Sequence, residues 1–155
     1  MNTTRLLLIV LVSSLIACSE RAAEAPAPDP TDPATYAEGQ AYTVRGVIAQ
    51  LPSDGPPPAE LKIHHEHIPD FIGETGEVFV NSEGVPGMKA MVMAFPNLAP
   101  GVEIESLEIG DKIEFDFLVR WEDAPGGRRS ATWLVSRLSS LPEDAEISFE
   151  NKPSP

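Results

Sequence analysis

The sequence predicts an all-β fold, a small barrel built from five short strands. Residues 112–121 alternate apolar and polar side chains, and this period of two is typical of a strand with one buried face. Other short apolar runs end at turn sequences such as Pro52-Ser53-Asp54-Gly55. Between residues 41 and 141 the dominant signals are therefore those of β structure.

The strands follow one another with short connections. In order, they are predicted over residues 42–51, 60–65, 88–95, 112–121 and 131–138. The fourth is the clearest, because Ile113, Phe115 and Phe117 alternate with Glu114 and Asp116. A turn-rich stretch, Asp123-Ala124-Pro125-Gly126-Gly127, returns the chain to the fifth strand.

One connector has mixed character. Residues 97–108, between the third and fourth strands, are predicted to be irregular or to form a short helix. Five short strands with one such connector favour a closed or partly closed five-stranded barrel of the OB type. Closure would also remove exposed strand edges.

The first residues of the chain have the features of a secretion signal. The apolar run from Leu6 to Ile16 is too short for a membrane span, which needs about 20 residues, so residues 1–17 are predicted to be a signal peptide. Leu15-Ile16-Ala17-Cys18 resembles the bacterial lipobox, in which the Cys is lipidated and starts the mature chain. An ordinary signal peptide with an incidental Cys18 is the alternative. Because Ser19 carries no aspartate-type retention signal, the resemblance implies a periplasmic protein anchored to the outer membrane.

The rest of the chain divides into three predicted parts. Residues 18–40 are rich in Pro and Ala and are expected to form a semi-stiff tether. Residues 41–142 form the barrel domain, and the polar residues 143–155 are expected to be a flexible tail. Cys18 is the single cysteine, so lipidation would leave the mature domain without a thiol for disulfides or for metal ligation.

The charge excludes several classes of partner. A formal net charge of −13 disfavours nucleic acid and anionic lipid headgroups, so the lipid anchor is the expected membrane contact. A charge of this size also fits an ordinary soluble surface. The chain has no Ser/His/Asp arrangement, no nucleophilic Cys in the mature part and no distinctive carboxylate pair, so it is not expected to be an enzyme.

The histidines and methionines are clustered. All three histidines lie within four residues, and the three methionines after the initiator lie within six: His64, His65 and His67, and Met88, Met91 and Met93. Imidazole and thioether together make a soft, neutral ligand set. This set suits Cu(I) and the chemically similar Ag(I).

Strand geometry predicts how these side chains meet. Met91 and Met93 share one face of a strand, about 6.8 Å apart. His65 and His67 likewise share a face, and His64 points the other way. If the second and third strands are neighbours, one imidazole nitrogen faces two sulfurs. Such a site favours Cu(I) over Zn, Mg or Ca, because these ions are usually coordinated by more nitrogen or oxygen ligands.

These residues carry a family resemblance. Residues 65–95, followed by Leu107-Glu108-Ile109-Gly110-Asp111-Lys112-Ile113-Glu114-Phe115, resemble the periplasmic copper- and silver-binding proteins of the CusF type. That family has a His-acidic-x-Ile element and a Trp-x-x-Met-x-Met-x-Phe element on a five-stranded OB-like barrel. The resemblance implies that His65, Met91 and Met93 are the metal ligands. It also implies a monomeric metallochaperone or buffer in copper homeostasis or resistance, whose partner is a copper efflux or copper-delivery protein.

The chain departs from that family at two places. Met88 stands where the family has the Trp that lies over the metal, so the thioether of Met88 is a candidate third sulfur ligand. His67 shares the face of His65, so its imidazole is a candidate second nitrogen ligand. Residues 70–87 make a longer connection, in which Val78-Phe79-Val80 are expected to form a small extra hairpin. The competing interpretation is an OB-like envelope lipoprotein that binds a protein or a carbohydrate, with the methionines serving only as core filler.

Overall fold

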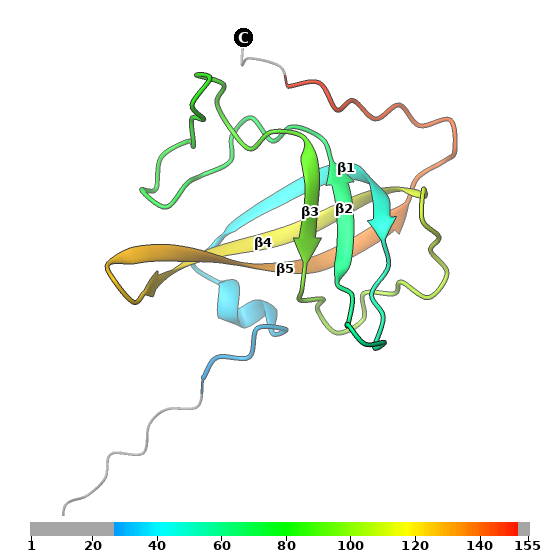
Figure 1. The fold of residues 1–155 in the computed structure, drawn as a ribbon, viewed down its shortest axis with the longest axis horizontal. Helices are drawn as coiled ribbons and strands as arrows, with labels where there is room; N and C mark the ends of the chain where they lie inside the picture. The colour runs from blue at the N-terminus through cyan, green and yellow to red at the C-terminus, as the bar shows by residue number, and fades with distance from the viewer. Residues whose placement is uncertain (1–26, 152–155) are drawn as a thin grey trace, which may run out of the picture.

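The computed structural model describes residues 27–151, and within this range the chain forms a barrel of five antiparallel strands (Figure 1). A short 3-10 helix comes first and the strands follow: η1 (Pro33–Tyr36), β1 (Gln40–Gln50), β2 (Leu61–His65), β3 (Met91–Phe95), β4 (Lys112–Ala124) and β5 (Arg128–Ser140). The predicted all-β, OB-like class is confirmed. None of the helices in residues 27–151 is long and apolar enough to cross a membrane.

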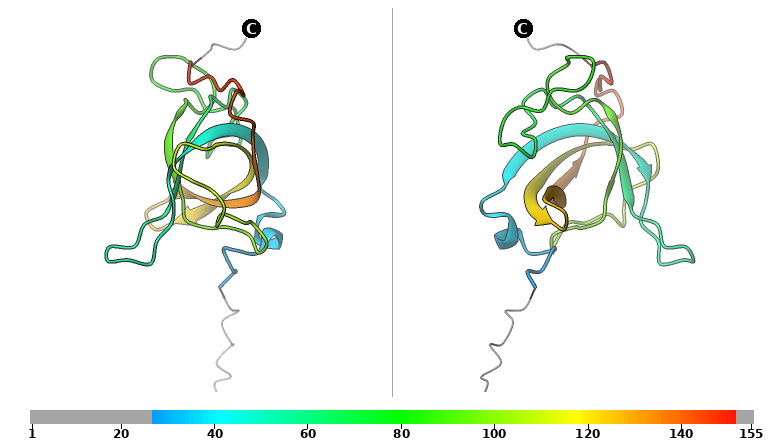
Figure 2. Two further views of the ribbon diagram at one scale, coloured as in Figure 1. Left: turned by 90° about the vertical axis from the view of Figure 1, so that its right-hand side faces the viewer. Right: turned by 60° about the vertical axis from the view of Figure 1, so that its left-hand side comes forward.

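The strand order closes the sheet on itself. Hydrogen-bonded neighbours run in the order β3-β2-β1-β4-β5, and all four pairings are antiparallel. Just after β3, Leu98 forms a parallel bridge with Val135 of β5. Val135 donates its N–H to Asn97 (3.0 Å), and its carbonyl accepts the N–H of Ala99 (2.8 Å). The two outer strands therefore approach each other, as the view along the barrel in Figure 2 shows.

The core is the inward face of these strands. In β4, Ile113, Phe115, Phe117 and Val119 are all buried, so the period-two prediction was correct. The ring of Phe95 from β3 meets Phe115 and Phe117 edge-on, with centroids 5.2 and 5.5 Å apart. Burial of each such ring contributes roughly 1.5–3 kcal/mol to the stability of the fold. These three rings form the aromatic cluster of the core.

The β4–β5 hairpin is longer than predicted. Pairing continues to Ala124 and Arg128, so residues expected to form a turn extend the ladder. Gly126 and Gly127 make the turn with φ of 90° and 75°. The hairpin projects from the barrel as a twisted ribbon (Figure 1).

The parts of the two flanking segments that the structure describes pack on the barrel, whereas residues 1–26 and 152–155 lie outside the described range. The signal peptide, Cys18 and the first part of the predicted tether lie outside the described residues. The last part of the tether packs on the barrel, since Tyr36 of η1 is 3% exposed and donates its hydroxyl to the carbonyl of Trp133 (3.3 Å). Residues 143–151 of the predicted flexible tail also lie against the barrel, where Lys112 donates to the carbonyl of Ala145 (2.8 Å).

The connection between β2 and β3 forms a lobe at one end of the barrel. It contains isolated bridges, Ile72 with Val78 and Val80 with Pro86, in place of the extra hairpin that the sequence suggested. A further bridge, Ile68 with Met88, continues the β2–β3 pairing beyond the ends of both strands. The third strand consequently begins at Met91, three residues later than predicted.

Gly87 fixes where this lobe joins the barrel. Its φ is +81°, and an added Cβ would lie 2.0 Å from the carbonyl oxygen of Ile68. Gly84 has a similar φ of +78°, but no atom lies within 4 Å of its added Cβ. Both positions favour glycine by conformation, whereas only Gly87 also needs it for space.

We therefore predict that Gly87→Ala is much more destabilising than Gly84→Ala. The left-handed conformation should cost about 1–2 kcal/mol in either variant, and the clash at residue 87 should add about 1–3 kcal/mol. Urea unfolding of both variants, compared with the wild-type protein, measures the difference. Equal losses of stability would contradict the close approach of Gly87 to Ile68.

Candidate metal centre

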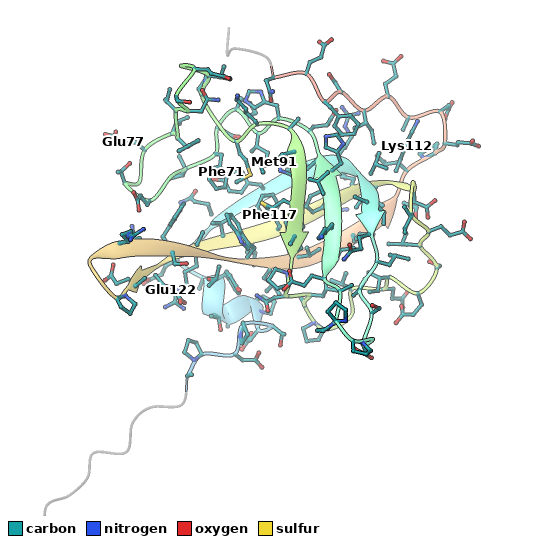
Figure 3. The ribbon with its side chains drawn as sticks, in the orientation of Figure 1. Phe71, Glu77, Met91, Lys112, Phe117 and Glu122 are labelled. Atoms are coloured by element: carbon teal, nitrogen blue, oxygen red, sulfur yellow. The ribbon has the colours of Figure 1, made fainter. Side chains whose placement is uncertain are left out.

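Pairing of β2 with β3 brings the predicted ligands together. His65 lies opposite Met91 and Ile63 lies opposite Met93 in the antiparallel register. Paired residues point to the same side of a sheet, with Cβ atoms about 5 Å apart, so His65, Met91 and Met93 share the inward face. The two strands are neighbours, which is the condition on which the predicted site depended. Figure 3 shows Met91 at the end of β3 where the chain enters from the lobe.

His65 is held in one tautomer. Its side chain is 1% exposed, and its Nδ1 lies 2.7 Å from the carbonyl oxygen of Glu66. A carbonyl oxygen can only accept, so Nδ1 carries the proton, and in the neutral ring Nε2 is left with a bare lone pair. Within residues 27–151 this buried Nε2 has no hydrogen-bond partner. An unpartnered buried nitrogen is uncommon, and a ring fixed through its other nitrogen is the usual arrangement of a metal-binding histidine.

The surroundings keep this ring neutral. Burial lowers the pKa of His65 below its usual value of 6.5, because the apolar interior disfavours the charged form. The hydrogen bond to Glu66 acts in the opposite direction, and the neighbouring His64 and His67 lower the pKa further. At neutral pH the lone pair of Nε2 is therefore free to bind a metal ion.

The three methionines differ in exposure. Met91 is 48% exposed, whereas Met93 is partly buried against the core cluster. Met88 also packs against the core, and it exchanges both backbone hydrogen bonds with Ile68 (2.9 Å each). A deeply placed imidazole and a half-exposed thioether thus lie at the same strand ends.

The other two histidines have different surroundings. His64 lies opposite Val92 on the outward face and stacks on Phe149, with ring centroids 3.7 Å apart and planes 6° apart. His67 directs Nε2 to the carbonyl oxygen of Pro86 (2.7 Å), so this nitrogen donates a hydrogen bond and is not a free ligand. Of the three, His65 alone combines burial with a nitrogen that lacks a partner within residues 27–151.

Other side chains supply no alternative metal cluster. Across residues 27–151 no group of three or more His, Cys, Asp or Glu side chains converges. Trp121 donates its indole N–H to the carbonyl of Ile72 (3.2 Å) and packs on the core, as does Trp133. Both tryptophans therefore belong to the packing of the core.

Residues that were not predicted to be ligands also adjoin the site. Glu66 orients His65 through its carbonyl, and its carboxylate accepts a two-pronged hydrogen bond from Arg45 (2.9 and 3.1 Å). Phe149 and Asn151 reach the same region from the C-terminal segment. The alternation of apolar and polar residues from Ile147 to Phe149 was a signal of an extended, docked segment.

The chain has little detectable similarity to known proteins. No family model matches the chain, and no curated protein matches it. One solved structure that is similar is apo-CusF from Escherichia coli, with 19% identity and a TM-score of 0.38, covering 68% of this chain and 93% of that one. A superposition this loose carries no argument about the site.

The buried imidazole predicts a pH dependence of stability. The unfolded chain takes up a proton on His65 near pH 6.5, whereas the folded protein does so only at lower pH. The free energy of unfolding of the metal-free protein should therefore decrease as the pH falls below about 6.5, and the decrease should end at the folded pKa. Urea unfolding between pH 7.5 and 5, approximate limits that bracket the usual histidine pKa, measures this slope.

Two variants test whether His65 causes this pH dependence of the unfolding free energy. His65→Gln should lose this contribution, because it removes the group whose pKa changes on folding. His67→Gln removes an imidazole but keeps buried His65, so it should retain the contribution of His65. An identical slope in the wild-type protein and in His65→Gln would show that His65 is not buried in its neutral form.

Proposed function

We propose that this protein binds one soft metal ion, Cu(I) or Ag(I), through His65, Met91 and Met93. The observation that carries the proposal is the buried Nε2 of His65, which has no partner within residues 27–151 and lies on the face shared by the two methionines. The ion is the cargo of a metallochaperone or buffer in copper homeostasis or resistance. No catalytic step is part of this function.

The chemistry of the ligands selects the ion. One neutral nitrogen and two thioether sulfurs add no negative charge and give a low coordination number. Cu(I) and Ag(I) accept such a set, whereas Zn²⁺ usually takes four nitrogen, oxygen or thiolate ligands and Ca²⁺ takes six or more oxygens. Thioethers also do not form disulfides, which suits an oxidising compartment.

Exposure of the ligands suggests how the ion enters and leaves. Met91 is half exposed and would meet an incoming ion first, and the buried His65 would bind it last. A partner could take the ion by the reverse order of exchanges, each with a small change in coordination. We propose that the partner is a copper efflux or copper-delivery protein and that the chain works in the periplasm, anchored through lipidated Cys18.

A second candidate is an interaction module without metal. Exposed apolar side chains in the lobe between β2 and β3, Val78, Phe79 and Val80, favour it, because a run of this kind is typical of a contact surface. In that case the methionines would only fill space in the core, and leucine would serve equally well.

Replacing both sulfurs separates the two candidates. Met91→Leu together with Met93→Leu keeps the volume and apolarity, so stability should change by less than about 1.5 kcal/mol for each residue. Cu(I) affinity should fall by more than about 100-fold, because changes that only touch a ligand's supporting groups already cost 10–100-fold. Anaerobic titration against a chromophoric Cu(I) chelator measures the affinity, and urea unfolding measures the stability.

Two further variants complete this test. Met88→Leu measures whether a third thioether takes part, and unchanged affinity would limit the set to His65, Met91 and Met93. Val92→Leu is the matched control, since it changes a half-exposed neighbour on the outward face of the same strand. A wild-type protein that does not compete with the chelator would overturn the metal-binding proposal and leave the interaction module.

A further inference from the structure

The C-terminal segment, residues 143–151, lies beside the candidate metal centre. In Figures 1 and 2 it runs past the end of the barrel at which the lobe between β2 and β3 is also found. It leaves β5 at Ser140 and is held first by Lys112, which donates to the carbonyl of Ala145 (2.8 Å). We call residues 143–151 the strap.

The strap contacts the residue that follows His65. Ser148 donates its backbone N–H to the Glu66 carboxylate (2.8 Å), which Arg45 also holds from β1. The carbonyl of the same Glu66 accepts the hydrogen bond from Nδ1 of His65. The orientation of the imidazole therefore depends on a residue that both the strap and β1 fix in place.

The strap also contacts the residue that precedes Met91. The side-chain oxygen of Asn151 accepts the backbone N–H of Ala90 (2.9 Å). Ala90 lies just outside β3, so its N–H would otherwise depend on solvent at the point where the chain enters the strand. The amide of Asn151 therefore anchors the backbone immediately before Met91.

Between these two contacts lies an aromatic stack. Phe149 covers the outward-facing ring of His64, with centroids 3.7 Å apart. The three contacts thus span the ends of both strands, on the residue after His65, on the outward neighbour of His65 and on the residue before Met91. They join parts of the chain separated by more than fifty residues, so docking of the strap costs backbone entropy that these contacts must offset.

We propose that the strap is a positioning element of the metal centre and that Phe149 and Asn151 are positioning residues. In the described residues, the strap's hydrogen bonds and its aromatic stack go to neighbours of the proposed ligands, Glu66, Ala90 and His64. It holds the backbone on either side of the site, so that the imidazole nitrogen of His65 and the sulfur of Met91 keep a fixed separation. A centre organised in advance loses its ion more slowly than one whose two halves move independently. This inference rests on the proposed metal binding.

The test uses the intact protein and removes the two strap side chains that make the stack on His64 and the hydrogen bond from Ala90. In Phe149→Ala combined with Asn151→Ala, Cu(I) should leave about two- to tenfold faster, the change expected from the loss of one or two modest contacts. Transfer to an excess of chromophoric chelator measures the rate of loss. Phe149→Tyr combined with Asn151→Asp keeps a ring and an acceptor oxygen and should restore most of the slow release.

A control and a second measurement separate positioning from general stability. Glu150→Ala alters the strap at a side chain that makes no ion pair or hydrogen bond in the described part of the chain, so it should release Cu(I) at the wild-type rate. Amide hydrogen exchange at Ala90 in the metal-free protein reports whether the strap is docked. The Ala90 amide should be protected in the wild-type protein and should exchange faster in Asn151→Ala.

Each outcome has one meaning. Wild-type release rates in the double alanine variant, in a wild-type protein that binds Cu(I), would overturn the positioning role and leave the proposed function intact. Equal acceleration by Glu150→Ala would overturn it too, because the effect would then not depend on the named contacts. A wild-type protein that binds no Cu(I) would instead overturn the proposed function, even if exchange at Ala90 showed a docked strap.

Discussion

One hydrogen bond organises the candidate centre. The carbonyl of Glu66 accepts from Nδ1 of His65 at 2.7 Å, and this contact fixes the tautomer, the ring orientation and the free lone pair on Nε2. Without it, Nε2 of His65 would not be the ring nitrogen that is free to bind an ion. The pairing of β2 with β3 gives that lone pair two thioethers on the same face, and burial keeps the ring neutral.

The unpartnered buried nitrogen of His65 reduces the stability of the barrel. A buried nitrogen without a partner costs roughly 1–3 kcal/mol, and an apolar residue at position 65 would avoid that loss. The aromatic cluster of Phe95, Phe115 and Phe117 supplies the stability against which such a loss is tolerated. Local violations of the rule that buried polar groups are paired tend to occur where a protein binds something. Here the unpartnered nitrogen belongs to His65, which is paired in the sheet with the half-exposed Met91.

Much of this could be predicted from the sequence because the signals were local. Alternation in residues 112–121 predicted β4, and the spacing of Met91 and Met93 predicted a shared face. The adjacency of β2 and β3 was only a condition of the site prediction, since strand order depends on contacts that no short window contains. Burial of His65 was also beyond the sequence, because the same residue type is found on the surface as often as inside.

The described parts of the flanking segments make contacts that the sequence did not indicate. A Pro-rich start and a polar end predicted a tether and a flexible tail, yet Tyr36 and Phe149 both pack on the barrel. Single aromatic residues in polar surroundings contribute little to composition, but each can bury a large area when a groove is present. The start of β3 was also placed too early, because Gly87 and the Ile68–Met88 bridge form an irregular entry that apolar pattern alone does not distinguish from a strand.

The most direct measurement is X-ray absorption at the copper edge of the Cu(I)-loaded protein. The spectrum should show sulfur scatterers from Met91 and Met93 and one nitrogen scatterer from His65 around the Cu(I) ion. In His65→Gln the nitrogen contribution should fall while the sulfur contribution persists. A spectrum with nitrogen or oxygen neighbours and no sulfur would contradict the central claim, because it would place the ion away from the methionine pair of β3.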